Sequence, residues 1–137
     1  MILDELIFDR TQEDVTARNA RGTYNASDLN RVGGAVLYIA ERLLSLGYLV
    51  DVPVPKTDWA ENDVPRRAEI ALHFASMHAL GKIPTFPAIL PVIPDGGGKL
   101  TFTGANDMEE YLYNYGRAEE SVRENFVFTG EMFGGEG

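Results

Sequence analysis

The side chains best suited to catalysis or metal binding are two histidines and two pairs of glutamates. His73 and His78 fall in one predicted helix, five residues apart, which places them roughly 140° apart around its axis. Two histidines that share a metal on one helix need the i, i+4 spacing instead. We therefore expect each to be a half-buried helix histidine rather than a metal ligand or a catalytic base.

The glutamate pairs, Glu109–Glu110 and Glu119–Glu120, bring carboxylates together along the chain. Paired carboxylates can exchange protons with a substrate when both face one site. Adjacent helix residues point about 100° apart, so neither pair shares a site. We interpret them as part of a solvated helix face, and the sequence predicts no catalytic residue.

Two segments have a superficial likeness to ligand-binding loops. Asp95–Leu100 is glycine-rich like a phosphate loop, but the leading glycine is missing and Leu100 stands where serine or threonine would bind magnesium. Asp58–Glu69 has the length of a calcium loop, but Ala60 and Asp63 occupy positions that need a ligand and a glycine. The sequence therefore predicts no metal and no cofactor.

Composition excludes several further classes of protein. The chain has 137 residues and no cysteine, which excludes a disulfide scaffold, a cysteine nucleophile and thiolate metal sites. Its formal charge is −9, from 21 acidic and 12 basic residues, which disfavours binding to nucleic acid. Neither a signal peptide nor an apolar run long enough for a membrane span is visible, so we expect synthesis in the cytoplasm and no membrane partner.

The apolar pattern predicts a mainly α fold. We expect a bundle of three main helices plus a short N-terminal helix, with short extended segments at the termini. The short helix begins after Thr11, which can form a capping box with Asp14. The clearest helix start is Asn25, which can cap the first main helix together with Asp28. The other expected boundaries are Gly47, Pro65, Gly81 and Thr103.

The first main helix carries a glycine pair in its interior. Its apolar face recurs at three- and four-residue steps from Leu29 to Leu46. Gly33–Gly34 interrupts it, although each glycine costs about 1 kcal/mol against alanine in a helix. The pair indicates either close approach of another helix or chain, or a tolerated kink, and the sequence leaves both open.

We expect residues 1–137 to form a single helical domain, with 1–10 as an extended N-terminal segment and 127–137 as a flexible or strand-forming tail. Tyr48–Val52 reads as a short strand or an extended connector. The proline-rich stretch Pro84–Pro94 is apolar, so we expect it to lie extended across the bundle. The tail from Phe126 could add a strand to a neighbouring chain.

Several aromatic residues are candidates for contact with other proteins, since tryptophan and tyrosine are enriched at interfaces. The alternative is that they belong to the edge of the core, and Tyr115 falls on the predicted core face. At least one of Tyr111 and Tyr113 is expected to be exposed. The candidate contact residues are Trp59, Tyr111, Tyr113, Phe126, Phe128 and Phe133.

Three stretches and a closing motif together resemble a known family. They are Gly22–Val32 (GTYNASDLNRV), Lys56–Trp59 (KTDW) with Asp63–Pro65 (DVP), and Leu100–Thr103 (LTFT) with Ala105–Asn106, closed by Thr129–Glu131 (TGE) and Gly135–Glu136. As a set they resemble a small module in phage and prophage proteins of Gram-positive bacteria, often in tail or other virion structural proteins. The resemblance covers nearly the whole chain in order. Members often have more residues between Asp9–Thr11 and the NASDLN stretch than this chain has.

The resemblance implies a helical module with a structural or adaptor role, synthesised in the bacterial cytoplasm and built into a phage particle. It carries no catalytic residue over to this chain. We therefore expect a non-catalytic assembly module that binds phage particle proteins, with a homo-oligomer as one form of assembly. The alternatives are a small acidic regulatory or host-directed protein-binding domain and an enzyme of unrecognised type. The motif residues also have plain physical roles, as helix caps at Asn25, Asp28 and Thr103.

Overall fold

A computed structural model describes residues 2–22, 24–48, 50–63, 66–83, 91–94 and 100–134, with backbone alone at 20, 67 and 125–134. Helices dominate these residues and none of them forms a strand, which confirms the predicted helical bundle. In chain order the elements are η1 (Ile2–Glu5), α1 (Gln12–Thr16), η2 (Ala20–Gly22), α2 (Ala26–Ser45), α3 (Arg67–Leu80) and α4 (Phe102–Gly134). Among them, no helix has the length and apolar composition that a membrane span requires.

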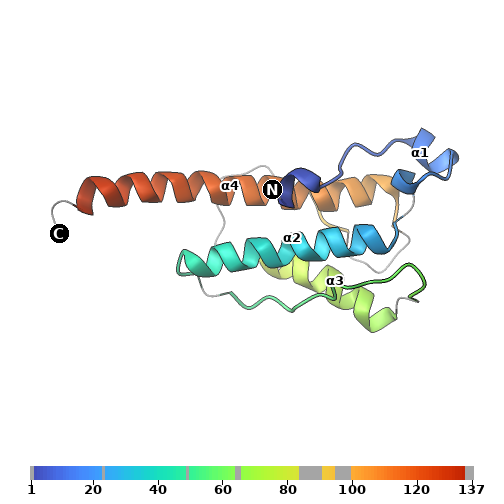
Figure 1. The fold of residues 1–137 in the computed structure, drawn as a ribbon, viewed down its shortest axis with the longest axis horizontal. Helices are drawn as coiled ribbons and strands as arrows, with labels where there is room; N and C mark the ends of the chain where they lie inside the picture. The colour runs from blue at the N-terminus through green and yellow to red at the C-terminus, as the bar shows by residue number, and fades with distance from the viewer. Residues whose placement is uncertain are drawn as a thin grey trace.

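The three main helices run in the same direction, as Figure 1 shows. Arg31 and Arg42 of α2 pair with Glu109 and Glu119 of α4, in the same order along both helices. His73 of α3 lies beside Tyr24, which precedes α2. Further along α3, the Leu80 carbonyl accepts a hydrogen bond of 2.9 Å from the hydroxyl of Tyr115, which is midway along α4. Parallel neighbours need long return connections, whereas antiparallel neighbours are joined by short loops.

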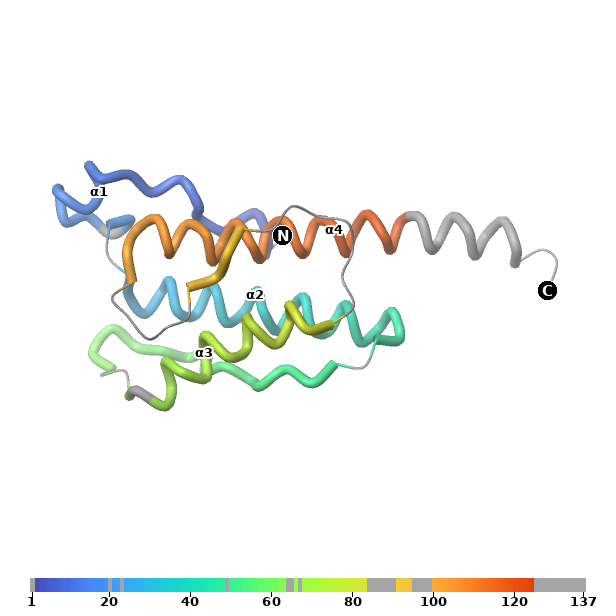
Figure 2. Tube along the Cα trace, turned by 180° about the vertical axis from the view of Figure 1, so that it is seen from behind, coloured from blue at the N-terminus to red at the C-terminus, as the bar shows by residue number. Residues whose placement is uncertain are grey.

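The first return connection runs back along α2 (Figures 1 and 2). The Asn30 side chain holds it there: its amide donates to the Trp59 carbonyl at 2.9 Å, and its oxygen accepts from the Trp59 N–H at 2.7 Å. These two bonds satisfy both backbone groups of Trp59. Residues 50–59 have no regular secondary structure, so the Tyr48–Val52 segment is an extended connector and not a strand over the residues described.

Most of the predicted helix boundaries are confirmed. Thr11 and Asn25 cap α1 and α2, each in a capping box with the acidic residue three positions later. Gly47, at φ 96°, follows the end of α2, in a conformation that glycine adopts without strain. The predicted cap of the last helix was two residues late. The Thr101 hydroxyl, not that of Thr103, accepts from the N–H of Gly104 at 3.1 Å.

The core lies between α2, α3, α4 and the N-terminal segment. The predicted apolar faces of α2 and α4 point into it, and the fully buried side chains there include Val36, Ile39, Met108 and Leu112. Each such side chain contributes about 1.5–3 kcal/mol relative to an exposed one. Leu3 of η1 is also fully buried, with its side chain against Gly116 of α4. The N-terminal segment is therefore part of the core.

The C-terminal segment differs from the prediction. Residues 127–134, expected to be a flexible or strand-forming tail, continue α4 to Gly134. No proline interrupts the chain after Pro94, and Gly130 costs only about 1 kcal/mol, so the helix can propagate through this segment. The strand addition expected from Phe126 is therefore not supported for this part of the chain. Parts of the predictions at Pro65, Pro84–Leu90, Asp95–Lys99 and residues 135–137 lie outside the described residues.

The glycine pair in α2 marks a close approach of the return connection. A Cβ at Gly33 would lie 3.2 Å from the Lys56 carbonyl oxygen and 3.2 Å from the Thr57 methyl carbon. A Cβ at Gly34 would meet only the end of the Ile2 side chain, at 3.5 Å. Close approach therefore explains Gly33, but the approaching segment is the return connection of the same chain and not another helix or a second chain.

We expect the two glycines to respond oppositely to alanine. Gly34→Ala should raise the free energy of unfolding by about 0.5–1 kcal/mol, because alanine is the better helix former and has room. Gly33→Ala should gain nothing or lose about 1 kcal/mol, since the backbone at Lys56 must move away. Urea unfolding of both variants measures the difference. Equal stabilisation by the two substitutions would show that the connection does not constrain Gly33.

Candidate functional site

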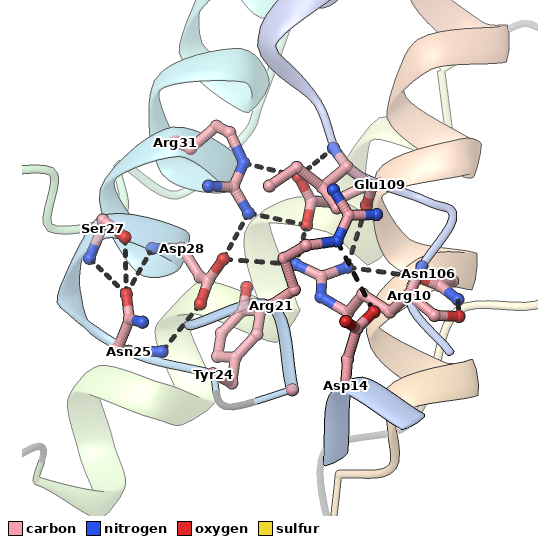
Figure 3. A network of polar contacts seen from close by, with 12 residues as sticks. Arg10, Asp14, Arg21, Tyr24, Asn25, Ser27, Asp28, Arg31, Asn106 and Glu109 are labelled. Atoms are coloured by element: carbon pink, nitrogen blue, oxygen red, sulfur yellow. Dashed lines mark hydrogen bonds and ion pairs between the residues drawn. The ribbon is translucent and has the colours of Figure 1, made fainter. Parts of the chain in front are cut away.

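A group of charged side chains is buried where the N-terminal segment, the start of α2 and the first turns of α4 meet (Figure 3). It consists of Arg10, Asp28, Arg31 and Glu109, and Arg10, Asp28 and Glu109 are each 5% exposed or less. The Arg10 guanidinium pairs with both carboxylates, at 3.2 Å from that of Asp28 and in closer contact with that of Glu109. Arg31 also pairs with both carboxylates. The four charges therefore cancel.

Neutral groups fix this charge network to the backbone. Glu109 accepts a hydrogen bond from the Ile7 N–H at 2.9 Å and two from Arg31, at 2.7 and 2.9 Å. The Asn106 side chain bridges to Arg10, accepting from its N–H at 3.0 Å and donating to its carbonyl at 3.0 Å. Asp28 accepts from the Asn25 N–H at 2.8 Å as part of the α2 capping box. One network thus joins three segments of the chain.

The chemistry of this network is that of a structural ion cluster. Burial opposes the charge on Arg31, but its hydrogen bonds to Glu109 and Asp28 prevail and raise its pKa. The pocket beside the network, lined by Arg10, Arg21, Tyr24 and Thr101 among others, has a volume of about 40 Å³. That volume holds little more than a few water molecules. The arrangement therefore fixes the fold rather than surrounding a substrate.

A second buried carboxylate lies further along α4. Glu119 is 1% exposed and pairs with Arg42 of α2 and, at 3.2 Å, with Arg123 one turn later. Arg123 also donates to the Arg42 carbonyl at 2.8 Å and to the Ser45 hydroxyl at 2.6 Å, both in the last turn of α2. The far ends of α2 and α4 are therefore joined by charge as well as by packing.

The prediction of a solvated helix face is wrong for Glu109 and Glu119. Both are buried because arginines from distant segments neutralise them, while Glu110 and Glu120 remain partly exposed. A sequence signal existed. Glu119 continues the three- and four-residue steps of Met108, Leu112 and Tyr115 along α4. A glutamate in phase with an apolar stripe indicates a buried ion pair.

The two histidines have different surroundings and do not share a site. His73 is 2% exposed rather than half-buried, and its Nε2 lies 3.1 Å from the Tyr24 hydroxyl. Its Nδ1 is buried without a hydrogen-bond partner among the described residues, and burial lowers the pKa of His73 to about 4. His78 is exposed, with its Nε2 3.1 Å from the Pro94 carbonyl oxygen. His73 is therefore a neutral core residue near pH 7.

The predicted protein-contact residues are not gathered on one surface. Trp59 and Tyr111 are buried, each 6% exposed, so neither presents a ring to a partner in this conformation. Tyr113 is partly exposed and lies between the Phe8 ring, at 5.2 Å, and the Arg117 guanidinium. Phe126, Phe128 and Phe133 belong to the last part of α4, and their side chains are outside the described part.

A hollow lies beside Trp59, one of the predicted contact residues. It has a volume of about 410 Å³ and is lined by Lys56, Trp59, Asp63, Arg66 and Glu69. The Lys56 ammonium lies 5.3 Å from the centroid of the indole ring. This volume is within the range of small-ligand pockets, but four of the five lining side chains are charged, whereas such pockets are mostly apolar.

Neither metal binding nor a known relative identifies this site. No group of three or more His, Asp or Glu side chains in the described ranges is placed to hold a metal ion. Comparisons with models of protein families, with characterised proteins and with solved structures found no match for this chain.

Proposed function

We propose that this chain is a structural or assembly module of a phage-type particle, which acts by binding other protein chains and not by catalysis. The observation that supports binding most strongly is the outer face of α3. A helix that is apolar on all sides is normally buried on all sides in a soluble protein. The bundle covers only one side of α3, and the other side is available for a partner.

The two sides of α3 are both apolar but differ in exposure. Phe74, Met77 and Leu80 are buried in the core. The opposite side presents Ala68, Ala71, Leu72 and Ala75, all exposed, at the three- and four-residue steps of a single helix face. Small side chains allow a second helix to approach closely. The fitting partner is an amphipathic helix of another particle protein, with basic residues beside its apolar face to complement the net charge of −9.

The motif residues behind the family resemblance support a structural role. Asn25 and Asp28 cap α2, Asp28 and Arg31 belong to the buried ion network, and Asn106 holds Arg10. Trp59 is fastened by Asn30, also from the motif. These shared polar groups are directed inward and maintain the fold, as a module reused in different particle proteins requires.

The outer face of α3 can be tested by placing charge on it. The double substitution Ala71→Glu and Ala75→Glu should leave the unfolding midpoint nearly unchanged, because both side chains are exposed. It should weaken binding to purified particle proteins encoded beside this chain by about tenfold or more, since a buried unpaired carboxylate is costly. Light scattering and pull-down measure association.

Ser121→Glu on α4 is the matched control, because it adds a carboxylate at an exposed helix position elsewhere. Ser121→Glu should bind like the unsubstituted chain. If the α3 double variant binds its partners with unchanged affinity, the outer face of α3 is not the interface. If neither the unsubstituted chain nor its oligomers associate with any particle protein, the assembly role itself is contradicted.

A further inference from the structure

The last turns of α4 extend beyond the rest of the bundle (Figure 1). Arg123 is level with the end of α2, because its guanidinium donates to the hydroxyl of Ser45, the last residue of that helix, at 2.6 Å. The end of α3 is level with Tyr115, whose hydroxyl donates to the Leu80 carbonyl. The segment Glu124–Gly134, here called the α4 extension, continues for roughly 16 Å with no other described helix beside it.

The α4 extension is apolar on most of its sides. Phe126 follows the buried Met108 by eighteen residues, about five full turns, so Phe126 and Phe133 occupy positions on the face of α4 that is buried in the bundle. Glu124 and Glu131, about two turns apart, share one narrow strip on the opposite face. The remaining apolar positions lie between these two faces and are Val127, Phe128 and Met132.

Packing, rather than helix propensity, must stabilise the α4 extension. Phenylalanine, valine, threonine, asparagine and glycine all form helices less readily than alanine or leucine, and they make up most of this segment. A helix that is apolar on most sides is normally buried on most sides. Inside the bundle, α2 covers one face of α4, but α2 ends before the extension begins. No described element of this chain covers the extension, which leaves that role to another molecule.

Charge decides which kind of molecule fits the α4 extension. After Arg123 the chain carries Glu124, Glu131 and Glu136, and no lysine, arginine or histidine. Pairing the extensions of two copies would bring only carboxylates together, in chains that each have a net charge of −9. A lipid surface fits no better, since helices that lie on membranes are rich in lysine and arginine. The complementary partner is a protein groove with an apolar lining and basic residues along one edge.

We propose that the α4 extension docks into an apolar groove of a partner protein, in which lysine or arginine side chains along one edge pair with Glu124 and Glu131. Helices bind in such grooves through apolar anchors two turns apart, and Phe126 and Phe133 have that spacing. This proposal rests on the proposed function, because the partner is another particle protein. It adds a second binding element, separate from the outer face of α3, so that one chain joins two partners as an adaptor does.

Removing the two anchors tests the docking in the full-length chain. The double substitution Phe126→Ser and Phe133→Ser should weaken binding to the purified particle proteins encoded beside this chain by about tenfold or more. It should leave the unfolding midpoint unchanged, because the extension does not pack on the described bundle. Val54→Ser is the control, since Val54 is a 68% exposed apolar residue on the return connection, and it should bind like the unsubstituted chain.

Reversing the charge of the strip tests the basic edge of the groove. Glu124→Lys with Glu131→Lys should weaken binding by about tenfold at low salt and make it less dependent on salt. Glu41→Lys with Glu61→Lys makes the same change of net charge at two exposed positions elsewhere and should have a smaller effect. Hydrogen exchange of the backbone amides from Phe126 to Gly134 should slow by at least about tenfold when the partner binds.

Four results would overturn the proposal. The first is unchanged partner affinity in the Phe126→Ser, Phe133→Ser variant, and the second is a lower unfolding midpoint of that variant, which would place the extension on its own bundle. The third is a mass that grows with concentration in light scattering and no longer does so in that variant, which would identify a second copy as the occupant. The fourth is sedimentation with phosphatidylglycerol vesicles that the same variant abolishes.

The two proposed binding surfaces fail in different experiments. Binding that is weakened by Ala71→Glu with Ala75→Glu but not by Phe126→Ser with Phe133→Ser would contradict the docking of the α4 extension alone. Binding that is weakened only by the second pair would contradict the outer face of α3 alone. No binding of the unsubstituted chain to any of the particle proteins would contradict the assembly role and this docking together.

Discussion

Replacing Glu109 with glutamine is expected to lower the free energy of unfolding by about 3–5 kcal/mol. The Glu109 side chain is fully buried and faces the guanidinium groups of Arg10 and Arg31. Glutamine has nearly the same shape but no charge, so Asp28 alone would remain to balance two arginines. The variant amide would also turn a donor group toward the Ile7 N–H or toward an arginine. Urea unfolding followed by circular dichroism measures the loss.

Glu110→Gln is the control for this experiment, since Glu110 is the next residue on the same helix and is partly exposed. It should change stability by no more than about 0.5 kcal/mol. Losses of similar size for the two variants would mean that the buried network contributes no more than a surface carboxylate. That outcome would show that the network does not hold the N-terminal segment against α4.

Acidification from pH 7 to pH 4 is expected to destabilise the chain by about 3 kcal/mol through His73 alone. Burial lowers the pKa of this histidine to about 4 in the folded chain, against an ordinary value of 6.5. The folded state therefore takes up this proton less readily than the unfolded state. The stability that the neutral His73 contributes is therefore fully present above pH 6.5, and it is lost progressively as the pH falls from 6.5 toward 4.

His73→Gln should flatten this pH dependence, because glutamine can still bond to the Tyr24 hydroxyl but does not titrate in this range. The readout is the slope of unfolding free energy between pH 6.5 and 4, not the absolute stability. His78→Gln, at an exposed position of the same helix, should leave the slope as it is. An unchanged slope in His73→Gln would show that another group is responsible.

The parts of the fold that could be predicted from the sequence are those governed by neighbours along the chain. The capping boxes at Thr11 and Asn25 involve residues three positions apart, and both are present. The apolar face of α2 repeats within one helix and is buried as expected. Gly47, directly after α2, has a positive φ that glycine adopts without help from distant residues. Each of these features is decided within one or two helical turns.

The parts that could not be predicted depend on residues far apart in the chain. Glu109 seemed to belong to a solvated face because its partners, Arg10 and Arg31, are 99 and 78 residues away. Trp59 seemed a candidate for an exposed aromatic because Asn30, which fastens it, is 29 residues away. The strand expected after Phe126 was suggested by local composition, while the backbone there is helical. The pocket beside Trp59 forms only when α3 begins next to the return connection.

The attachment of Arg10 and Ile7 to α4 determines when the chain can complete its fold during synthesis. The first ten residues leave the ribosome early, but Asn106 and Glu109 are added about a hundred residues later. At roughly 5–20 residues per second, that delay is about 5–20 seconds. Until α4 emerges, the arginines of the N-terminal half have no Glu109 or Glu119 to pair with, and the part of the apolar face of α2 that packs against α4 remains uncovered. A nascent chain of this protein therefore acquires its stability late and nearly all at once, and any arrest of translation before α4 leaves an incomplete product for the cell's chaperones and proteases.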